Sequence, residues 1–254
     1  MEKKWAFITG ATSGIGWATA LALAGQGYSI FATGRRRDKL NELETALKAA
    51  HPNIQVKSAQ FDISDRDDVT QFMKAHYAEM AHIDVLVNNA GLAKGVDKMQ
   101  DAKLEDWDTM IDTNVKGLLY VTRGIVEHMV RRNSGHIVNL GSVAGRWTYP
   151  GGGVYCATKF AVRALSEGLR MDLLGSKVRV TNIEPGMVHT EFSLVRLGDQ
   201  SKADKVYEGM TPLSAQDIAE TIAWCVARPA HVNIQELVIY PTDQAHVGQV
   251  ARKN

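Results

Sequence analysis

The fold is decided by the stretch Trp5-Ala6-Phe7-Ile8-Thr9-Gly10-Ala11-Thr12-Ser13-Gly14-Ile15-Gly16. Its first four residues are an apolar run that a glycine-rich turn stops at once, which is typical of a buried strand. A helical stretch, residues 17–24, follows. A strand, a glycine loop and a helix N-terminus in this order predict a pyrophosphate cradle, because glycines let the backbone approach the phosphates and the helix amides and dipole attract them. A tight structural turn is the alternative interpretation.

Strand and helix patterns alternate from this stretch to the end of the chain. Further strands are predicted at 28–33, 54–61, 83–87, 136–140, 178–184 and 237–240, and helices at 38–50, 65–81, 104–132, 154–174 and 214–228. This alternation implies right-handed crossovers and an α/β fold, a doubly wound parallel sheet of about seven strands with helices on both faces. We therefore expect a single domain, residues 1–254, with a substrate lid at about 187–213 and a C-terminal tail at 241–254.

The composition argues against several classes of protein. A length of 254 residues suits one domain, and 45% hydrophobic residues with a net charge of +1 give no sign of disorder or of a nucleic-acid partner. Two cysteines, Cys156 and Cys225, are too few for a disulfide framework or a thiolate metal site, and no His or Cys cluster has metal-ligand spacing. No run approaches the ~18 apolar residues of a membrane span, and Thr9-Gly10 comes too soon for a signal peptide. We expect a cytoplasmic protein with no metal.

The end of the second predicted strand indicates the kind of dinucleotide. Gly34-Arg35-Arg36-Arg37 follows this strand, and no carboxylate comes before Asp38. An NAD site usually places a carboxylate here to hold the ribose 2′-hydroxyl, whereas an arginine accommodates a 2′-phosphate. We therefore predict NADP(H), with Arg35 as the first candidate for the phosphate and Arg36 as the second. A solvated helix start is the alternative interpretation of these arginines.

A second glycine-rich stretch carries the candidate chemistry. A strand breaks at Gly141-Ser142, and glycines 151–153 lead into a helix with Tyr155 and Lys159. Residues four apart share a helix face, so the Lys159 ammonium can lie beside the Tyr155 hydroxyl and lower its pKa. Tyr155 is then a candidate general acid or base, and Ser142 a candidate hydrogen-bond donor to the reacting oxygen. A surface helix with a chance tyrosine and lysine is the alternative.

Together the motifs resemble the short-chain dehydrogenase/reductases of the Rossmann type over essentially the whole chain. They are Thr9-Gly10-x-x-x-Gly14-x-Gly16, Asn88-Asn89-Ala90-Gly91, Asn114, Ser142, Tyr155-x-x-x-Lys159 and Pro185-Gly186 with Thr190. The resemblance implies that Tyr155 is the acid/base and that Ser142 positions the substrate oxygen. It also implies that Lys159 lowers the Tyr155 pKa and binds the nicotinamide ribose, and that Asn114 holds a water linking Lys159 to solvent.

The resemblance further implies which residues line the cofactor site. They are Gly10, Thr12, Ser13, Gly14, Ile15, Gly16, Arg35, Arg36, Asp62, Ile63, Asn89, Ala90, Gly91, Tyr155, Lys159, Pro185, Gly186, Val188 and Thr190. Asp62 follows a strand, where it can take the adenine amino group or, with Ser64, cap the next helix. Ser13 occupies the place where many NADP-preferring relatives carry a basic residue, so the NADP prediction depends on Gly34-Arg35.

Several segments are similar to one subgroup, the NADP-dependent 3-hydroxy acid dehydrogenases and the bacterial sulfoacetaldehyde reductases. They include Asn88–Ala93, Asp106–Asn114, Ile183–Gly186, Thr190–Ser193 and Pro229–Ile234. Both substrate types are small and carry an anion near the reacting carbonyl, which requires a positive or multiply donating anchor near Ser142 and Tyr155. The candidates are Arg196 in the lid, Tyr149 before the Tyr155 helix, and Gln244, which could come from a neighbouring subunit. For each, a solvated loop side chain is the alternative.

The predicted function is NADP(H)-dependent interconversion of a small anionic aldehyde and its hydroxy acid. One alternative is a broad carbonyl or steroid reductase of the same family, which would need an apolar pocket. Another is a non-catalytic NADP-binding regulator, although such proteins usually lose the tyrosine or the lysine. By family analogy the helices at 104–132 and 154–174 suggest a homotetramer. His189 and Cys156 are interpreted as packing or surface residues.

Overall fold

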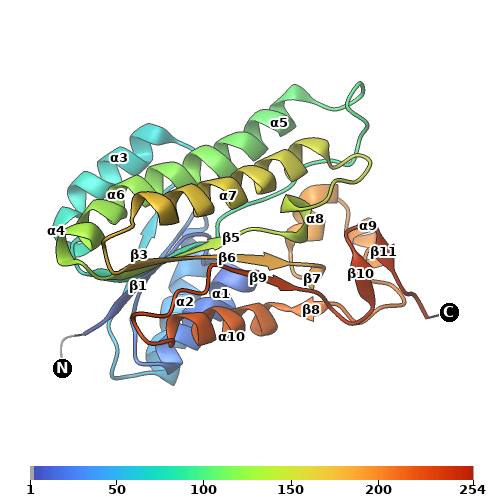
Figure 1. The fold of residues 1–254 in the computed structure, drawn as a ribbon. Helices are drawn as coiled ribbons and strands as arrows, with labels where there is room; N and C mark the ends of the chain where they lie inside the picture. Colours follow the sequence, from blue (N-terminus) through green and yellow to red (C-terminus); the bar gives the residue numbers. More distant parts are fainter. Residues whose placement is uncertain (1–2, 254) are drawn as a thin grey trace.

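A parallel sheet lies between two layers of helices in the computed structural model, which describes residues 3–253 (Figure 1). Seven strands follow the order β3-β2-β1-β4-β5-β6-β9. Their bounds are β1 Trp5–Ile8, β2 Ser29–Gly34, β3 Val56–Gln60, β4 Ile83–Asn88, β5 Gly135–Leu140, β6 Val178–Pro185 and β9 Glu236–Ile239. The predicted doubly wound sheet is thereby confirmed. Residues 1, 2 and 254, the outer ends of the predicted domain, lie outside the described part of the chain.

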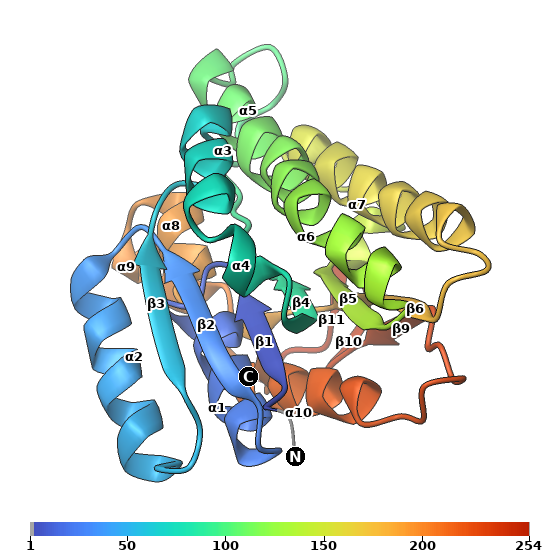
Figure 2. The same ribbon diagram turned by 90° about the vertical axis from the view of Figure 1, so that its left-hand side faces the viewer.

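Helices cover both faces of the sheet (Figure 2). One layer holds α1 Gly14–Gly25, α2 Arg37–Ala50 and α10 Ala215–Val226; the other holds α3 Arg66–Ala75, α4 Tyr77–Met80, α5 Leu104–Ile111, α6 Leu118–Arg132 and α7 Gly153–Asp172. Most strands contribute side chains to two cores, one on each face of the sheet, because successive side chains point to opposite faces. In β1, Ala6 and Ile8 pack in the first core and Phe7 in the second. Among residues 3–253, no helix has the length and apolar character needed to cross a membrane.

The sheet reverses its strand order at β1, which pairs in parallel with both β2 and β4. Open parallel sheets bind ligands in the crevice outside the carboxyl ends of their strands at such a switch point. The glycine loop follows β1 directly, and Asn89 follows β4 directly. The topology therefore brings together two motifs that lie about eighty residues apart in the chain.

The predicted helix at 104–132 is interrupted. A π-helical segment, Asp112–Gly117, separates α5 from α6. Within it, the Asn114 side chain donates to the Leu92 carbonyl at 2.8 Å and to the Thr158 hydroxyl at 3.0 Å, and accepts from the Leu92 amide at 2.8 Å. Single π-turns occur frequently at functional sites. The predicted helix at 65–81 is also divided, with α3 ending before His76 and α4 beginning after it.

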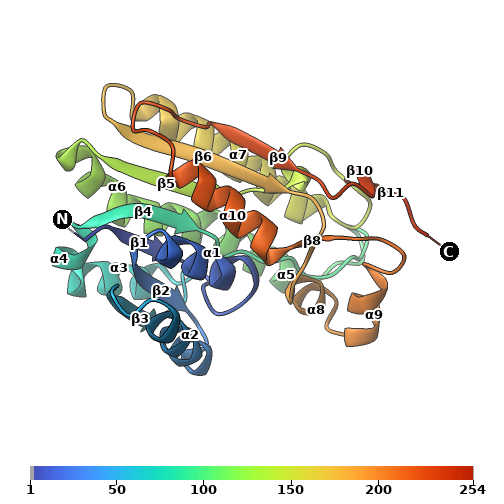
Figure 3. The same cartoon turned by 90° about the horizontal axis from the view of Figure 1, so that it is seen from below.

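The segment predicted to be a lid, called the lid below, and the C-terminal tail lie together at the carboxyl end of the sheet (Figure 3). The lid region contains β7 Val188–His189, α8 Phe192–Leu197, α9 Gln200–Lys205 and β8 Leu213–Ser214, and the tail contains β10 Gln244–His246 and β11 Gln249–Val250. The tail contacts the lid directly: the Lys253 amide donates to the Gly209 carbonyl at 2.7 Å, and the Thr211 amide donates to Asp243 at 2.7 Å. The tail therefore supports the lid, which has its own parallel pair of strands, β7 and β8.

Candidate active site

A cleft of about 610 Å³ runs over the carboxyl ends of the strands. Its walls come from the glycine loop, the ends of β2, β3 and β4, the turn after β6 and the lid. Of the predicted cofactor and substrate residues, the cleft is lined by Gly10, Thr12, Ser13, Gly14, Ile15, Arg35, Arg36, Asp62, Ile63, Asn89, Ala90, Gly91, Ser142, Tyr149, Tyr155, Lys159, Pro185, Gly186, Val188, Thr190, Arg196 and Gln244. Two predicted residues, Gly16 and Asn114, are outside this lining and act from behind it.

The glycine loop has the shape of an anion cradle. Gly10 and Gly14 adopt left-handed φ angles of +63° and +52°, which favour glycine. The Asn89 side chain holds the turn by donating to the carbonyls of Thr9 and Gly10 at 2.9 and 3.0 Å. A Cβ atom on Gly16 would collide with this Asn89 amide, so Gly16 allows the close packing that shapes the cradle, and its place in the cofactor site stays a prediction.

The start of α1 is open to a negatively charged group. Ser13 precedes the helix, and its side chain makes no capping hydrogen bond among the described residues. The first amides of an uncapped helix lack intrahelical partners and attract anions. Gly14 and Ile15, which carry such amides, line the cleft. The loop and helix start therefore fit a pyrophosphate, as the sequence predicts.

Two arginines stand at the β2 end of the cleft with different partners. The Arg35 guanidinium is largely exposed and lies 3.6 Å from the Asp62 carboxylate. Arg36 instead donates to Thr12, to the hydroxyl at 3.2 and 3.3 Å and to the carbonyl at 3.2 Å, and forms an ion pair with Glu191 of the lid at 3.0 Å. Arg35 is thus the freer of the two cations.

Asp62 does not cap helix α3. Its carboxylate accepts hydrogen bonds from the Ser64 amide and hydroxyl at 2.9 and 2.8 Å, which closes a short turn after β3. The cap of α3 is Asp65, whose side chain accepts from the amides of Asp67 and Asp68. The capping alternative for Asp62 is therefore wrong, and Asp62 and Ile63 line the cleft beside Arg35.

Ser142, Tyr155 and Lys159 converge at the other end of the cleft. Ser142 precedes a 3₁₀ turn, Val143–Gly145, and its Oγ atom accepts from the Ala144 amide at 3.1 Å. Tyr155 and Lys159 lie on α7, and both side chains are more than nine-tenths buried. The Lys159 Nζ atom donates to the Leu140 carbonyl at 2.8 Å and is 5.9 Å from the centroid of the Tyr155 ring.

The surroundings of Tyr155 act on its pKa in both directions. Burial raises it above the ordinary value for a phenol, and the nearby Tyr149 raises it further, while the Ser142 hydroxyl and the Arg196 charge lower it. The Lys159 ammonium donates to the Leu140 carbonyl, and burial lowers the pKa of Lys159 to about 8. That Lys159 lowers the pKa of Tyr155 stays a prediction.

Asn114 lies behind the Lys159 ammonium. A Cβ atom built on Gly91 would be 3.2 Å from the Asn114 Oδ1 atom and 3.5 Å from the Lys159 Nζ atom. Because glycine has no side chain, this space between the cleft and the lysine stays open. Asn114 also holds Thr158, the residue before Lys159. That Asn114 binds a water linked to Lys159 stays a prediction.

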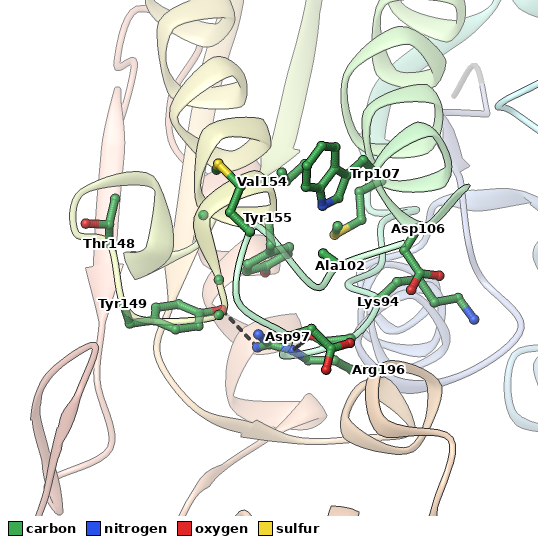
Figure 4. Close-up of a pocket in the computed structure, with 16 residues that line it drawn as sticks. Lys94, Asp97, Ala102, Asp106, Trp107, Thr148, Tyr149, Val154, Tyr155 and Arg196 are labelled. Carbon is green, nitrogen blue, oxygen red and sulfur yellow. Dashed lines mark hydrogen bonds between the residues drawn. The ribbon is translucent and has the colours of Figure 1, made fainter. Parts of the chain in front are cut away.

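A second cavity, of about 390 Å³, opens beside Tyr155 (Figure 4). Tyr149, Tyr155 and Arg196 line both the cleft and this cavity. The Arg196 Nη1 atom donates to the Tyr149 hydroxyl at 2.8 Å, and its Nε atom donates to the Gly95 carbonyl at 3.0 Å. The guanidinium carbon is 5.9 Å from the centroid of the Tyr155 ring. Two of the three predicted anion-binding residues are thus brought together next to Tyr155.

Gln244 lines the cleft and is bonded within its own chain. Its side chain is buried, the amide oxygen accepts from the Met187 amide at 2.8 Å, and the amide nitrogen donates to the His246 carbonyl at 3.2 Å. A Cβ atom on Gly186 would collide with the Gln244 oxygen. Gln244 therefore supports the turn after β6. That it binds the substrate anion, in its own or a neighbouring subunit, stays a prediction.

Sequence reasoning missed the outer wall of the second cavity and the support beneath Ser142. The cavity wall includes Lys94, Gly95, Asp97, Met99, Asp106, Trp107 and Met110. Beneath Ser142, Arg146 forms ion pairs with the buried Glu184 and with Glu236, and Asn182 donates to Glu184 at 2.7 Å. Position gives part of the signal, since Lys94, Gly95, Asp97 and Met99 follow β4 and Arg146 follows β5 at the edge where ligands bind. Asn182 and Glu184, within β6, and Glu236, at the start of β9, carry no such signal. His189 packs edge-on against Tyr207 and Cys156 is buried, as expected.

Known proteins resemble the whole chain. A family model of short chain dehydrogenases matches residues 4–198. The NADP-dependent 3-hydroxy acid dehydrogenase YdfG of Escherichia coli (strain K12) is 47% identical over 243 residues, 95% of this chain and 96% of the relative. Sulfoacetaldehyde reductase 2 of Chromohalobacter salexigens is 46% identical over 240 residues, 94% of each chain. The closed form of serine dehydrogenase complexed with NADP+ is 45% identical, with a TM-score of 0.90, and 98% of this chain and 99% of that one are covered.

The chain therefore belongs to the short-chain dehydrogenase family. The predicted family, the Rossmann-type fold and the prediction of an oxidoreductase are confirmed. The predicted subgroup is also found among the relatives, which include both a 3-hydroxy acid dehydrogenase and a sulfoacetaldehyde reductase.

Proposed function

We propose that this chain is an NADP(H)-dependent oxidoreductase that interconverts a small anionic aldehyde and its hydroxy acid. The observation that carries the proposal is the position of Arg196, whose guanidinium is fixed by Tyr149 and Gly95 next to the Tyr155 ring. A guanidinium with a planar set of donors suits a carboxylate or a sulfonate equally well. The names of the two relatives, one for each kind of anion, support the same substrate class.

The described residues fit the dinucleotide. The glycine loop and the start of α1 would hold the pyrophosphate, Arg35 and Arg36 the 2′-phosphate, Asp62 and Ile63 the adenine side, and Lys159 the nicotinamide ribose. When bound, the nicotinamide supplies the hydride for reduction and takes it up in oxidation. The serine dehydrogenase with a TM-score of 0.90 was solved with NADP+, which supports the choice of cofactor.

The chain's own residues supply the proton and the orientation. In the reducing direction the Tyr155 hydroxyl donates its proton to the carbonyl oxygen as negative charge develops there, and the Ser142 hydroxyl donates a second hydrogen bond. An ordinary phenol carries its proton at neutral pH, and burial raises the pKa of Tyr155 further. Arg196 holds the substrate anion so that the carbonyl lies between Ser142 and Tyr155, which lowers the entropic part of the barrier.

Two other functions have less support. A broad carbonyl reductase needs an apolar pocket, and Trp107 and Met110 give the second cavity some apolar wall. An uncharged, apolar substrate would displace water from the Arg196 guanidinium beside Tyr155 without pairing with its charge, which costs free energy. A non-catalytic regulator has no use for a buried tyrosine and lysine in the cleft. A homotetramer and a cytoplasmic location stay predictions.

The substrate proposal predicts a marked preference for anionic aldehydes. With NADPH, we expect kcat/KM for sulfoacetaldehyde or malonic semialdehyde to exceed that for propanal by about tenfold to 150-fold, because a charge-assisted hydrogen bond is worth about 1.5–3 kcal/mol. Serine and 3-hydroxypropanoate, assayed with NADP+, extend the comparison to the oxidising direction. Equal rates for propanal and the acidic aldehydes would contradict the proposal and favour the broad carbonyl reductase.

The cofactor proposal predicts a change of preference when Arg35 is replaced. Arg35→Ala should lower the ratio of kcat/KM for NADPH to that for NADH by about tenfold, since one charged partner of the 2′-phosphate is lost while NADH contacts stay the same. Arg37→Ala is the matched control, because Arg37 begins α2 and donates to Ser58 at 3.3 Å, outside the cleft. If both variants kept the NADPH preference, Arg35 would not bind the phosphate.

A further inference from the structure

Arg36 stands between the cofactor cleft and the lid. Its Nε and Nη2 atoms donate to Thr12 of the glycine loop, and its Nη1 atom lies 3.0 Å from a carboxylate oxygen of Glu191. Arg36 lines the cleft next to Arg35, where the 2′-phosphate is proposed to bind. A phosphate that approaches Arg36 must therefore share it with the Glu191 carboxylate, which already neutralises part of its charge.

Glu191 belongs to the segment that carries the substrate anchor. It comes immediately before α8, Phe192–Leu197, and Arg196 lies near the other end of that short helix. That end is attached to the loop after β4, because the Gly95 amide donates to the Arg196 carbonyl at 3.0 Å and the Arg196 side chain donates to the Gly95 carbonyl. The helix is thus fixed at both ends, by Glu191 to the cofactor side and by Arg196 to the substrate side.

We propose that Glu191 is a positioning residue that links the lid to Arg36 through their ion pair. This ion pair weakens the binding of the cofactor 2′-phosphate by Arg36. The inference rests on the proposed function, in which Arg196 is the substrate anchor. The Arg36–Glu191 ion pair therefore has two effects. Its carboxylate lowers the affinity of Arg36 for a phosphate, and it keeps the lid, and with it Arg196, in place. Removing the charge of Glu191 therefore acts in opposite directions on the two ligands.

The variant Glu191→Gln tests this directly. We expect the Kd for NADP+ to fall by about two- to fivefold, the size of effect that a half-exposed ion pair produces, because Arg36 is released to the phosphate. The Kd for NAD+, which lacks the phosphate, should stay within about 1.5-fold on the same reasoning. The KM for the acidic aldehyde should rise by about two- to fivefold with little change in kcat, because Arg196 is held less firmly.

A readout without substrate follows from the lid itself. Trypsin can cleave after Arg196, Lys202 and Lys205, all within α8 and α9. At saturating NADP+, we expect these cuts to be about two- to fivefold faster in Glu191→Gln than in the natural sequence, in proportion to the loss of the ion pair. If no anionic aldehyde is turned over, the proposed function is overturned. The role of Glu191 is still tested in that case, because NADP+ affinity and trypsin cleavage do not require a substrate.

Two further variants give the controls. Glu42→Gln removes a carboxylate from an exposed ion pair with Lys39 on α2 and should change none of these quantities. In the double variant Arg36→Gln/Glu191→Gln, the gain in NADP+ affinity should disappear, because the group that Glu191 releases is gone. A Glu191→Gln protein whose NADP+ affinity stays the same or weakens would overturn the proposal, and so would lid cleavage at the natural rate.

Discussion

Tyr155→Phe is expected to lower kcat for reduction of the substrate by about 10²- to 10⁴-fold, the usual contribution of a positioned general acid. The variant loses only the hydroxyl, and the ring keeps its contact with Phe192 at a centroid distance of 5.6 Å. It also keeps its place in a cluster with Leu92, Met110 and Cys156. Because packing is preserved, the loss of rate reports on the proton, and kcat at saturating substrate with NADPH is the quantity to measure.

Cofactor binding and stability separate this role from a structural one. The Kd for NADPH, followed by fluorescence, should change by less than about twofold, since Lys159 and the glycine loop are untouched. The melting temperature should not fall, because the variant no longer buries a hydroxyl. Tyr149→Phe is the matched control: it removes a hydroxyl from the same cluster, one that is bonded to Arg196, and should affect KM more than kcat. A Tyr155→Phe enzyme that kept a tenth of its kcat would exclude Tyr155 as the acid.

The parts of the site that the sequence predicts are those set by local chemistry. The glycine loop between β1 and α1 needs left-handed backbone at Gly10 and Gly14, and an eight-residue pattern is enough to indicate it. Tyr155 and Lys159 share a face of α7 because they lie one turn apart. The alternation of strands and helices predicts the sheet and therefore the edge at which these motifs meet.

The parts that could not be predicted depend on burial or on contacts between distant segments. The raised pKa of Tyr155 follows from how completely its side chain is buried, which no spacing shows. The break between α5 and α6 accompanies the bonding of Asn114 to Leu92 and Thr158. The hydrogen bonds of Gln244 within its own chain depend on the path of the tail, which brings Gln244 under the turn after β6 and is a property of the tertiary structure.

Arg196, the proposed anchor of the substrate anion, joins the lid to the cavity beside Tyr155. Arg196→Met should lower kcat/KM for an acidic aldehyde by about tenfold to 150-fold, mostly through KM, because a charge-assisted hydrogen bond worth about 1.5–3 kcal/mol is lost. Arg196→Lys should give an intermediate loss. Lysine keeps the charge but lacks the planar guanidinium of arginine. It therefore cannot donate to Tyr149, to Gly95 and to the substrate at the same time.

Arg196 also fastens the lid to Gly95, so a loss of activity has two possible sources. An uncharged aldehyde of similar size separates them. A loosened lid lowers kcat/KM for propanal and for the acidic aldehyde by the same factor, whereas loss of the anion site lowers it only for the acidic one. We expect the propanal value to change by less than about threefold, within the range of a weakened surface contact. Equal losses for both aldehydes would mean that Arg196 only holds the lid in position and that another residue binds the anion.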